Sequence, residues 1–198
     1  MGRMAKPGCQ DCQRCFNECQ IPEGMKHEVI MICPPWKQYR IYRRSHKILT
    51  GTISPKMVKA MVAFQFLGDC LEYLTSPDHI VFIWVTEKFA DDCRDYMKHL
   101  GYQYHQYLAW QRPKWKRGTS KEVLEYLMVY YKGALFSSAM TFPDPLKSPF
   151  TGRVKNRKYK PADAYALIES IFPNRSKLQV FGSTRRPGWN VFLHKCKK

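Results

Sequence analysis

Short apolar runs, and longer segments with an apolar residue at every third or fourth position, divide most of the chain into expected strands and helices. The runs at 27–32 and 79–85 are almost wholly apolar, which is typical of strands covered on both faces. Thr86 follows the second run and is expected to cap a helix that ends at Gly101. The apolar positions of this helix recur at helical spacing, at Phe89, Cys93, Tyr96, Met97 and Leu100.

The rest of the pattern predicts further strands and helices in alternation. A helical region is expected at 54–74, with Ser54 as its N-cap and a break at 76–78, and a second helix should run from Pro161 to residue 172. Strands are expected at 102–110, 125–131, 135–142, 178–181 and 189–193, the last two around a turn at 185–188. This alternation indicates an α/β domain with three layers and a mostly parallel central sheet.

The length and composition allow one substantial core, because the chain has 198 residues of which 44% are hydrophobic. Residues 1–24 are polar and lack an apolar period, so we expect an appendage there and a single domain at 25–198. No stretch approaches the roughly 20 continuous apolar residues of a membrane span, and the N-terminal residues contain no apolar signal segment. We therefore expect an intracellular protein without a membrane partner.

The charge favours a polyanionic partner, since 33 basic and 16 acidic residues give a formal charge of +17. Nucleic acid is the first candidate, and the alternative is a basic face that only keeps the protein in solution. Tyr39, Tyr42, Trp115 and Tyr159 lie among the cations, as on surfaces that track phosphates and stack on bases, although such rings can equally pack beneath loops. Three strips without acids hold these cations: Lys37, Arg40, Arg43, Arg44 and Lys47; Arg112, Lys114, Lys116 and Arg117; Arg153, Lys155, Arg157, Lys158 and Lys160.

Four cysteines near the N-terminus have the spacing C-x2-C-x2-C-x3-C: Cys9, Cys12, Cys15 and Cys19. This is the spacing of an iron-sulfur run, but the usual proline after the fourth cysteine is absent. Four thiolates could instead close one tetrahedral zinc site, although the spacings are tight for a single ion. A thiol-rich tail without metal is the third interpretation. Zinc is the first of the three.

Four segments of the chain carry a family resemblance. One is Cys33, Pro34, Pro35 and Trp36 after the first strand, and the second is the apolar strand at 82–86 with its helix. The third is Glu125 with 127–129 and 132–133. The fourth is the C-terminal run of Lys160, Pro161, Tyr165, 168–169, 181–182 and 187–189. Together they resemble the methyltransferase family of the messenger-RNA 6-methyladenine writer over 27–194. The resemblance implies a Rossmann-like methyltransferase fold with permuted motif order.

The departures from this family concern its reacting and cofactor-binding groups. Active members have Asp at the position of Cys33, where the carboxylate accepts a hydrogen bond from the amine of a flipped adenine. They also have Glu-Leu-Phe, then Gly or Ala, then Arg, where this chain has Gln179 to Ser183. A Gly-Asn-Glu or Gly-Asn-Gln ending stands where this chain has Leu193, His194 and Lys195. The resemblance therefore implies degenerate catalytic and S-adenosylmethionine sites.

Several retained residues have two interpretations. Lys160 matches a Lys-Pro element, so it either keeps a residual anion site or belongs to a basic surface strip. Trp36 is expected to stack structurally in an empty pocket rather than bind a base. Glu125 is expected to hold the loop beside it rather than act in catalysis.

We expect a catalytically silent, nuclear subunit of a heteromeric adenine methyltransferase, in which an Asp-Pro-Pro-Trp homologue uses S-adenosylmethionine and this chain binds no cofactor. The resemblance is closest to the inactive partners in ciliate DNA 6-methyladenine methyltransferase complexes, where small homeobox-like DNA-binding proteins also take part. DNA is the expected substrate, with RNA as the alternative. An active methyltransferase with altered site chemistry and a stand-alone nucleic-acid-binding protein are the other hypotheses.

Overall fold

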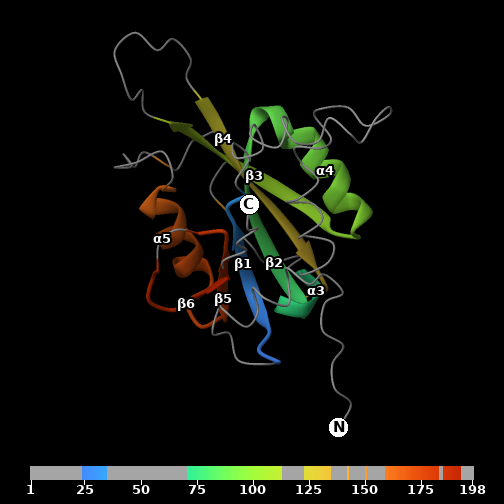
Figure 1. Cartoon of the computed structure of the whole chain (residues 1–198), viewed down its shortest axis with the longest axis vertical. Helices are drawn as coiled ribbons and strands as arrows, with labels where there is room; N and C mark the ends of the chain where they lie inside the picture. Colours follow the sequence, from blue (N-terminus) through green and yellow to red (C-terminus); the bar gives the residue numbers. More distant parts are fainter. Residues whose placement is uncertain are drawn as a thin grey trace, which may run out of the picture.

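The protein was analysed as a computed structural model, which describes residues 24–34, 71–112, 123–134, 142, 150, 159–182 and 185–192. These residues form one sheet with helices beside it (Figure 1). The strands are β1 (His27–Ile32), β2 (Thr75–Thr86), β3 (Gln103–Arg112), β4 (Val123–Lys132), β5 (Lys177–Val180) and β6 (Trp189–Phe192). The helices are α3 (Leu71–Leu74), the 3-10 turn η2 (Glu87–Phe89), α4 (Ala90–His99) and α5 (Ala162–Ile171).

The six strands lie in the order β3-β4-β2-β1-β5-β6. β1 pairs in parallel with both β2 and β5, and β5 pairs in parallel with β6. β4 is antiparallel to β2 and to β3, so it alone runs against the other five strands. The expected mostly parallel sheet is confirmed. We call the edge where β1, β2, β5 and β6 end the carboxyl edge, and the opposite edge the amino edge.

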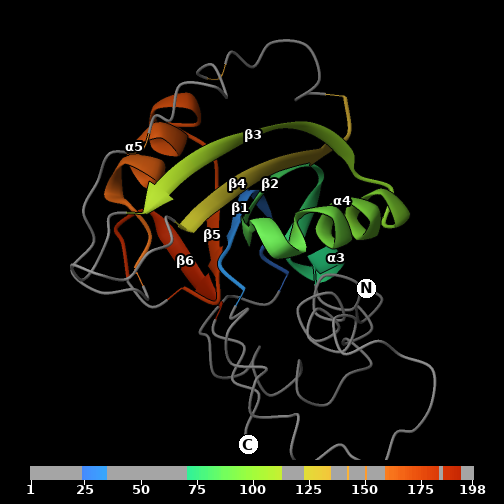
Figure 2. The same ribbon diagram turned by 90° about the horizontal axis from the view of Figure 1, so that it is seen from above.

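Helices cover both faces of the sheet, which gives the expected three layers (Figure 2). Successive strand residues point to opposite faces, so the central strands supply two separate cores. On one face Val81, Ile83 and Val85 pack in a cluster with Phe89, Cys93 and Met97 beside α4. On the other face Ile80, Phe82 and Trp84 pack in a cluster with Tyr165, Ile168 and Phe172 beside α5.

The start of β2 corrects one sequence expectation. Ser76, Pro77 and Asp78 were expected to separate a helix from a strand beginning at His79, but β2 already begins at Thr75. His27 pairs with Thr75 and Val29 with Ile80, so two steps along β1 correspond to five along β2. The extra residues form a bulge, which accommodates a proline within a sheet.

Other boundaries differ by a few residues. Thr86 makes no side-chain capping hydrogen bond, because the 3-10 turn η2 precedes α4. Gly101, with φ of +78°, follows α4 as expected. Phe181 is not part of β5 and has φ of +60°. The expected helix at 54–70 and the strand residues 135–141 and 193 lie outside the described residues.

Gly133 tests the contact between the start of β2 and the end of β4. Its φ is +87°, and an added Cβ would lie 1.6 Å from Asp78 Oδ1, which accepts a hydrogen bond from the Ala134 amide. Gly133→Ala should therefore lower the free energy of unfolding by about 2–4 kcal/mol, through backbone strain plus overlap. Urea denaturation measures this loss. Gly188→Ala is the control, since it shares the positive φ of +77° but has open space around the Cβ; an equal loss in both variants would contradict the Asp78 contact.

Candidate functional site

The topology places a crevice at the carboxyl end of β1. From β1 the chain passes to β2 on one side, and later returns to β5 on the other side. In open α/β sheets, ligands bind outside the carboxyl ends of the strands at such a switch point. Cys33 lies there, and its backbone amide donates to the Val180 carbonyl at 3.0 Å.

Cys33 contributes a neutral thiol to this edge. The side chain is half-buried and is not in a disulfide. Burial raises the pKa of the thiol to about 12; the nearby Lys160 ammonium lowers this pKa and the Glu125 carboxylate raises it, both by less. The thiol therefore keeps its proton at neutral pH, and it supplies only a weak hydrogen-bond donor and acceptor.

Lys160 and Glu125 form a buried ion pair beside Cys33. Glu125 lies near the start of β4, opposite Thr86 at the end of β2, and Lys160 precedes α5. Lys160 Nζ donates to Glu125 Oε2, and their side chains are only 16% and 5% exposed. The ammonium also lies 4.9 Å from the ring centroid of Trp84. The position of Glu125 agrees with a role in holding the neighbouring segment.

This pair corrects one of the two interpretations of Lys160. Its side chain does not belong to an exposed basic strip, because it is largely covered and packs over Trp84. Its ammonium donates to Glu125, and a residual anion site at Lys160 stays a prediction. The basic residues around Lys160 in the sequence gave no indication of this partner, which lies 35 positions earlier.

Gln179 packs beneath α5. It is 1% exposed, and its Nε2 donates to the Tyr165 hydroxyl at 2.7 Å. The amide lies against the backbone of Gly182, where an added Cβ would lie 1.6 Å from Nε2. Gly182 is therefore needed for the position of this side chain, and Gln179 is part of the core below the switch point.

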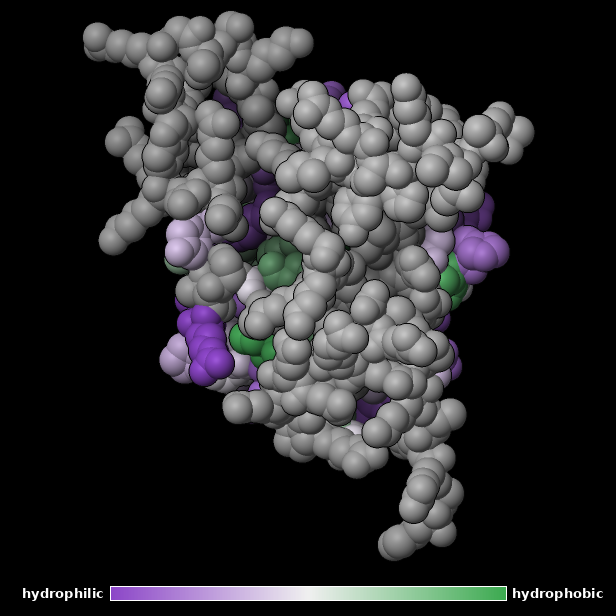
Figure 3. Space-filling view, in the orientation of Figure 1, coloured by the Kyte–Doolittle hydropathy of each residue, from purple (hydrophilic) through white to green (hydrophobic). Residues whose placement is uncertain are grey.

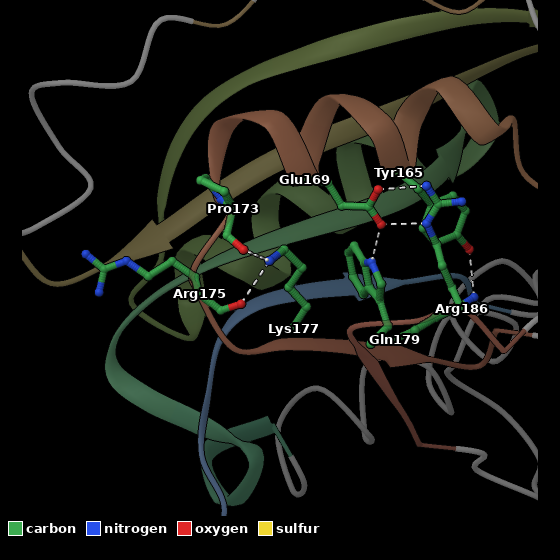
Figure 4. A network of polar contacts seen from close by, with 8 residues as sticks. Tyr165, Glu169, Pro173, Arg175, Lys177, Gln179 and Arg186 are labelled. Carbon is green, nitrogen blue, oxygen red and sulfur yellow. Dashed lines mark hydrogen bonds and ion pairs between the residues drawn. The ribbon is translucent and has the colours of Figure 1, made fainter.

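Glu169 joins α5 to the turn before β6 (Figure 4). Arg186 binds both of its carboxylate oxygens, at 2.5 and 2.7 Å, and Trp189 Nε1 donates to one of them at 2.8 Å. The hydrogen bonds from Arg186 are the main cause of a lowered pKa for Glu169. The guanidinium carbon of Arg186 also lies 5.2 Å from the ring centroid of Tyr165. Sequence reasoning found Glu169, Trp189 and Tyr165 as part of the resemblance and Arg186 as part of a turn, but it missed the network they form.

Two of the positions that depart from the family offer no negative charge to the sulfonium and ammonium groups of S-adenosylmethionine. Cys33 keeps its proton, and Gln179 carries no charge. Glu125, at the same edge, is paired with Lys160. The exposed Glu87, which directly follows β2, is a further carboxylate at this edge.

The structure brings four expected site residues to one edge: Cys33, Pro34, Lys160 and Gln179. The others lie outside the described residues: Pro35, Trp36, Ser183, Leu193, His194 and Lys195; the cations Lys37, Arg40, Arg43, Arg44, Lys114, Lys116, Arg117, Arg153, Lys155, Arg157 and Lys158; and the cysteines Cys9, Cys12, Cys15 and Cys19.

The described residues that adjoin the three basic strips in the sequence all lie at the carboxyl edge. The first strip follows Pro34, and the third leads to Lys160. The second strip connects Arg112 to Val123, which are paired at the same edge of the sheet.

Among the described residues, no group of three His, Cys, Asp or Glu side chains is placed to hold a metal, which leaves the N-terminal cysteines untested. No helix in the described part of the chain is long and apolar enough to cross a membrane.

A family model described as MT-A70 matches residues 27–192, from the first residue of β1 to the last residue of β6. A search of curated proteins finds no match to the chain.

Proposed function

The chain belongs to the MT-A70 family, and we propose that it is a non-catalytic subunit of a heteromeric adenine 6-methyltransferase. In this proposal an active homologue with Asp-Pro-Pro-Trp binds S-adenosylmethionine and transfers the methyl group. The present chain supports that subunit and contributes contacts to DNA, with RNA as the alternative. The observation that carries the proposal is the neutral, half-buried thiol of Cys33 at the switch point.

The neutral thiol of Cys33 lacks the negative charge that favours methyl transfer to an amine. Methylation of an exocyclic amine develops positive charge on nitrogen, and a carboxylate beside the amine stabilises that charge. A thiol whose pKa is raised to about 12 cannot do so at neutral pH. Lys160, the cation next to it, is paired with Glu125. The site therefore favours a binding or scaffolding role over methyl transfer.

The distribution of charge supports a nucleic-acid role for the segments around the sheet. The described residues include 11 of the 33 basic and 10 of the 16 acidic residues, so they are almost neutral together. Most of the formal charge of +17 lies in the remaining segments, which include the three strips. In Figure 3 the described part of one face shows hydrophilic residues with only small hydrophobic areas.

The proposed partners follow from the same resemblance. An Asp-Pro-Pro-Trp homologue is the catalytic partner, and small homeobox-like DNA-binding proteins are further candidate subunits, as in ciliate DNA methyltransferase complexes. A nuclear location goes with this assignment. Zinc at Cys9, Cys12, Cys15 and Cys19 remains a separate proposal based on ligand spacing alone.

Calorimetric titration of the isolated chain with S-adenosylmethionine tests the proposal. We expect no binding tighter than about 100 μM, equivalent to roughly 5.5 kcal/mol, and no methyl transfer to adenine. Cys33→Asp should not create activity by itself. The cofactor-binding positions near Gln179 and Lys195 still differ in charge from those of active family members. Added to an Asp-Pro-Pro-Trp homologue, the wild-type chain should co-purify with it and raise its methylation rate.

The alternatives give different results. Tight cofactor binding with methyl transfer by the chain alone would identify an active enzyme with altered chemistry. Nucleic-acid binding without co-purification or stimulation would identify a stand-alone binding protein. Either result would contradict the subunit proposal.

A further inference from the structure

Two histidines are buried at the amino edge of the sheet, opposite the candidate site. His27 is the first residue of β1 and is 0% exposed, and His79 lies in β2 just after the bulge and is 3% exposed. Both lie against the corner formed by 71–79, where α3 passes into β2 at the lower end of the sheet in Figure 1. We call these residues the α3–β2 corner.

The His79 ring uses both of its nitrogens. Nδ1 lies 2.6 Å from the Ser76 carbonyl oxygen, which can only accept, so Nδ1 carries the proton. Nε2 lies 2.8 Å from the hydroxyl of Tyr102, at the start of β3, and accepts from it. The neutral ring therefore links the bulge of β2 to β3.

The His27 ring has the same arrangement. Nδ1 lies 3.0 Å from the Leu74 carbonyl oxygen and donates to it. Nε2 lies 2.9 Å from Nδ2 of Asn190, in β6, and accepts from it. This neutral ring links the end of α3 to β6 on the far side of β1 and β5.

The two rings hold carbonyls that are two residues apart, Leu74 and Ser76, at one corner. A proton added to Nε2 of His27 would face the donor Nδ2 of Asn190, and one added to Nε2 of His79 would require the Tyr102 hydroxyl to turn from donor to acceptor. In both rings it would place a charge in a buried position. We propose that His27 and His79 act together as a two-proton switch, which releases the α3–β2 corner on acidification while the carboxyl edge stays formed.

The charged groups around each ring decide whether a protonated ring could be accommodated. His79 faces the Lys132 ammonium, which lies 4.4 Å from the Tyr102 ring centroid, and it adjoins Asp78, whose carboxylate accepts from the Ala134 amide. Around His27, the Lys26 ammonium donates to the Glu72 carbonyl, and Met25 and Asn190 are uncharged. Lys132 therefore lowers the pKa of His79 and Asp78 raises it, while the Glu72 carboxylate acts on Tyr102, the partner of His79. The pKa of His27 is set by burial and by the Leu74 carbonyl.

The direction of the pH dependence follows from burial. Burial lowers the pKa of both rings, and the carbonyl bonds raise it by less. A ring exposed by opening has the ordinary pKa of about 6.5, so below that pH the open corner binds more protons than the closed corner. The closed corner has its full stability above about pH 6.5. It loses stability as the pH falls toward the lowered pKa values of the two rings in the folded protein.

Amide hydrogen exchange on the full chain, read as protection factors between pH 7.5 and 5.0, tests the switch. Protection of amides in 71–79 should fall by up to about a hundredfold per pH unit below pH 6.5, because each histidine supplies about tenfold. Amides of Ile30, Ile32 and Val180 should keep their protection. Nitrogen-15 spectra of the wild-type rings should show Nδ1–H tautomers for both histidines at pH 7.5.

Single variants separate the contributions of the two histidines to the pH dependence of protection. His27→Asn and His79→Asn each keep a donor near the carbonyl and remove the titrating ring, so each should reduce the slope to about tenfold per pH unit. His99→Asn, at the exposed end of α4, should keep the wild-type slope.

Three results would overturn the proposal: Nε2–H tautomers in the wild-type rings, a wild-type slope near zero, or equal loss of protection at Val180. The tautomer measurement needs no variant.

Discussion

Lys160→Met should lower the free energy of unfolding by about 3–5 kcal/mol, because it breaks a largely buried ion pair by removing the ammonium that donates to Glu125. Glu125 is 5% exposed in this pair, so water cannot replace the ammonium. The variant also removes the charge that lies over the Trp84 ring. Urea unfolding followed by tryptophan fluorescence measures the loss.

The double variant Lys160→Met with Glu125→Leu should recover much of this stability, since exchange of a buried pair for apolar side chains is often neutral. Arg175→Met is the matched control, because the Arg175–Glu28 pair is 45% and 25% exposed and should contribute less than about 1 kcal/mol. A loss for Lys160→Met no larger than that for Arg175→Met would show that Glu125 is solvated.

Lys114→Ala with Lys116→Ala should weaken binding of the assembled complex to a DNA duplex by roughly fiftyfold at 0.1 M salt. The estimate assumes one phosphate contact for each lysine, and each lost contact lowers the log-log salt slope by about 0.9. The loss should be similar for different sequences, because phosphate contacts carry no base information. Titrations at several salt concentrations give both quantities.

Lys88→Ala with Lys98→Ala is a control with the same change in charge. Both lysines are exposed at opposite ends of the η2–α4 segment, where the acids still outnumber the cations. Its other exposed charged residues are Glu87, Asp91, Asp92, Asp95 and Arg94. Phosphates should avoid this acidic surface, so the control should change binding little. Equal effects of the two double variants would mean that only total charge matters and that the strip makes no contacts.

The sequence was most informative for helices and strands whose burial follows from their own residue pattern. The helical spacing of Phe89, Cys93 and Met97 predicted the face of α4 that packs on the sheet, and all three are buried. The apolar run 79–85 predicted a strand covered on both faces, and its two sets of alternating residues enter two cores. Local periodicity is sufficient in such cases.

The sequence was insufficient where distant segments meet. Pro77 indicates a break locally, yet the pairing of β1 with both sides of the bulge keeps it within β2. The basic residues before Lys160 indicate a surface strip, yet Glu125 comes from another strand and holds its ammonium in the interior. A local sequence pattern does not reveal an ion-pair partner that lies 35 residues away.

The central position of β1 also has a consequence for synthesis on the ribosome. β1 is the first strand of the described chain, but one of its two neighbours, β5, begins only at Lys177. Until that segment emerges, one side of the apolar strand from Val29 to Ile32 has no β5 to pair with, and this high contact order predicts slow folding. The hairpin of β3 and β4, with β2 beside it, can form earlier. We therefore expect the nascent chain to need protection of β1 from aggregation until β5 has emerged.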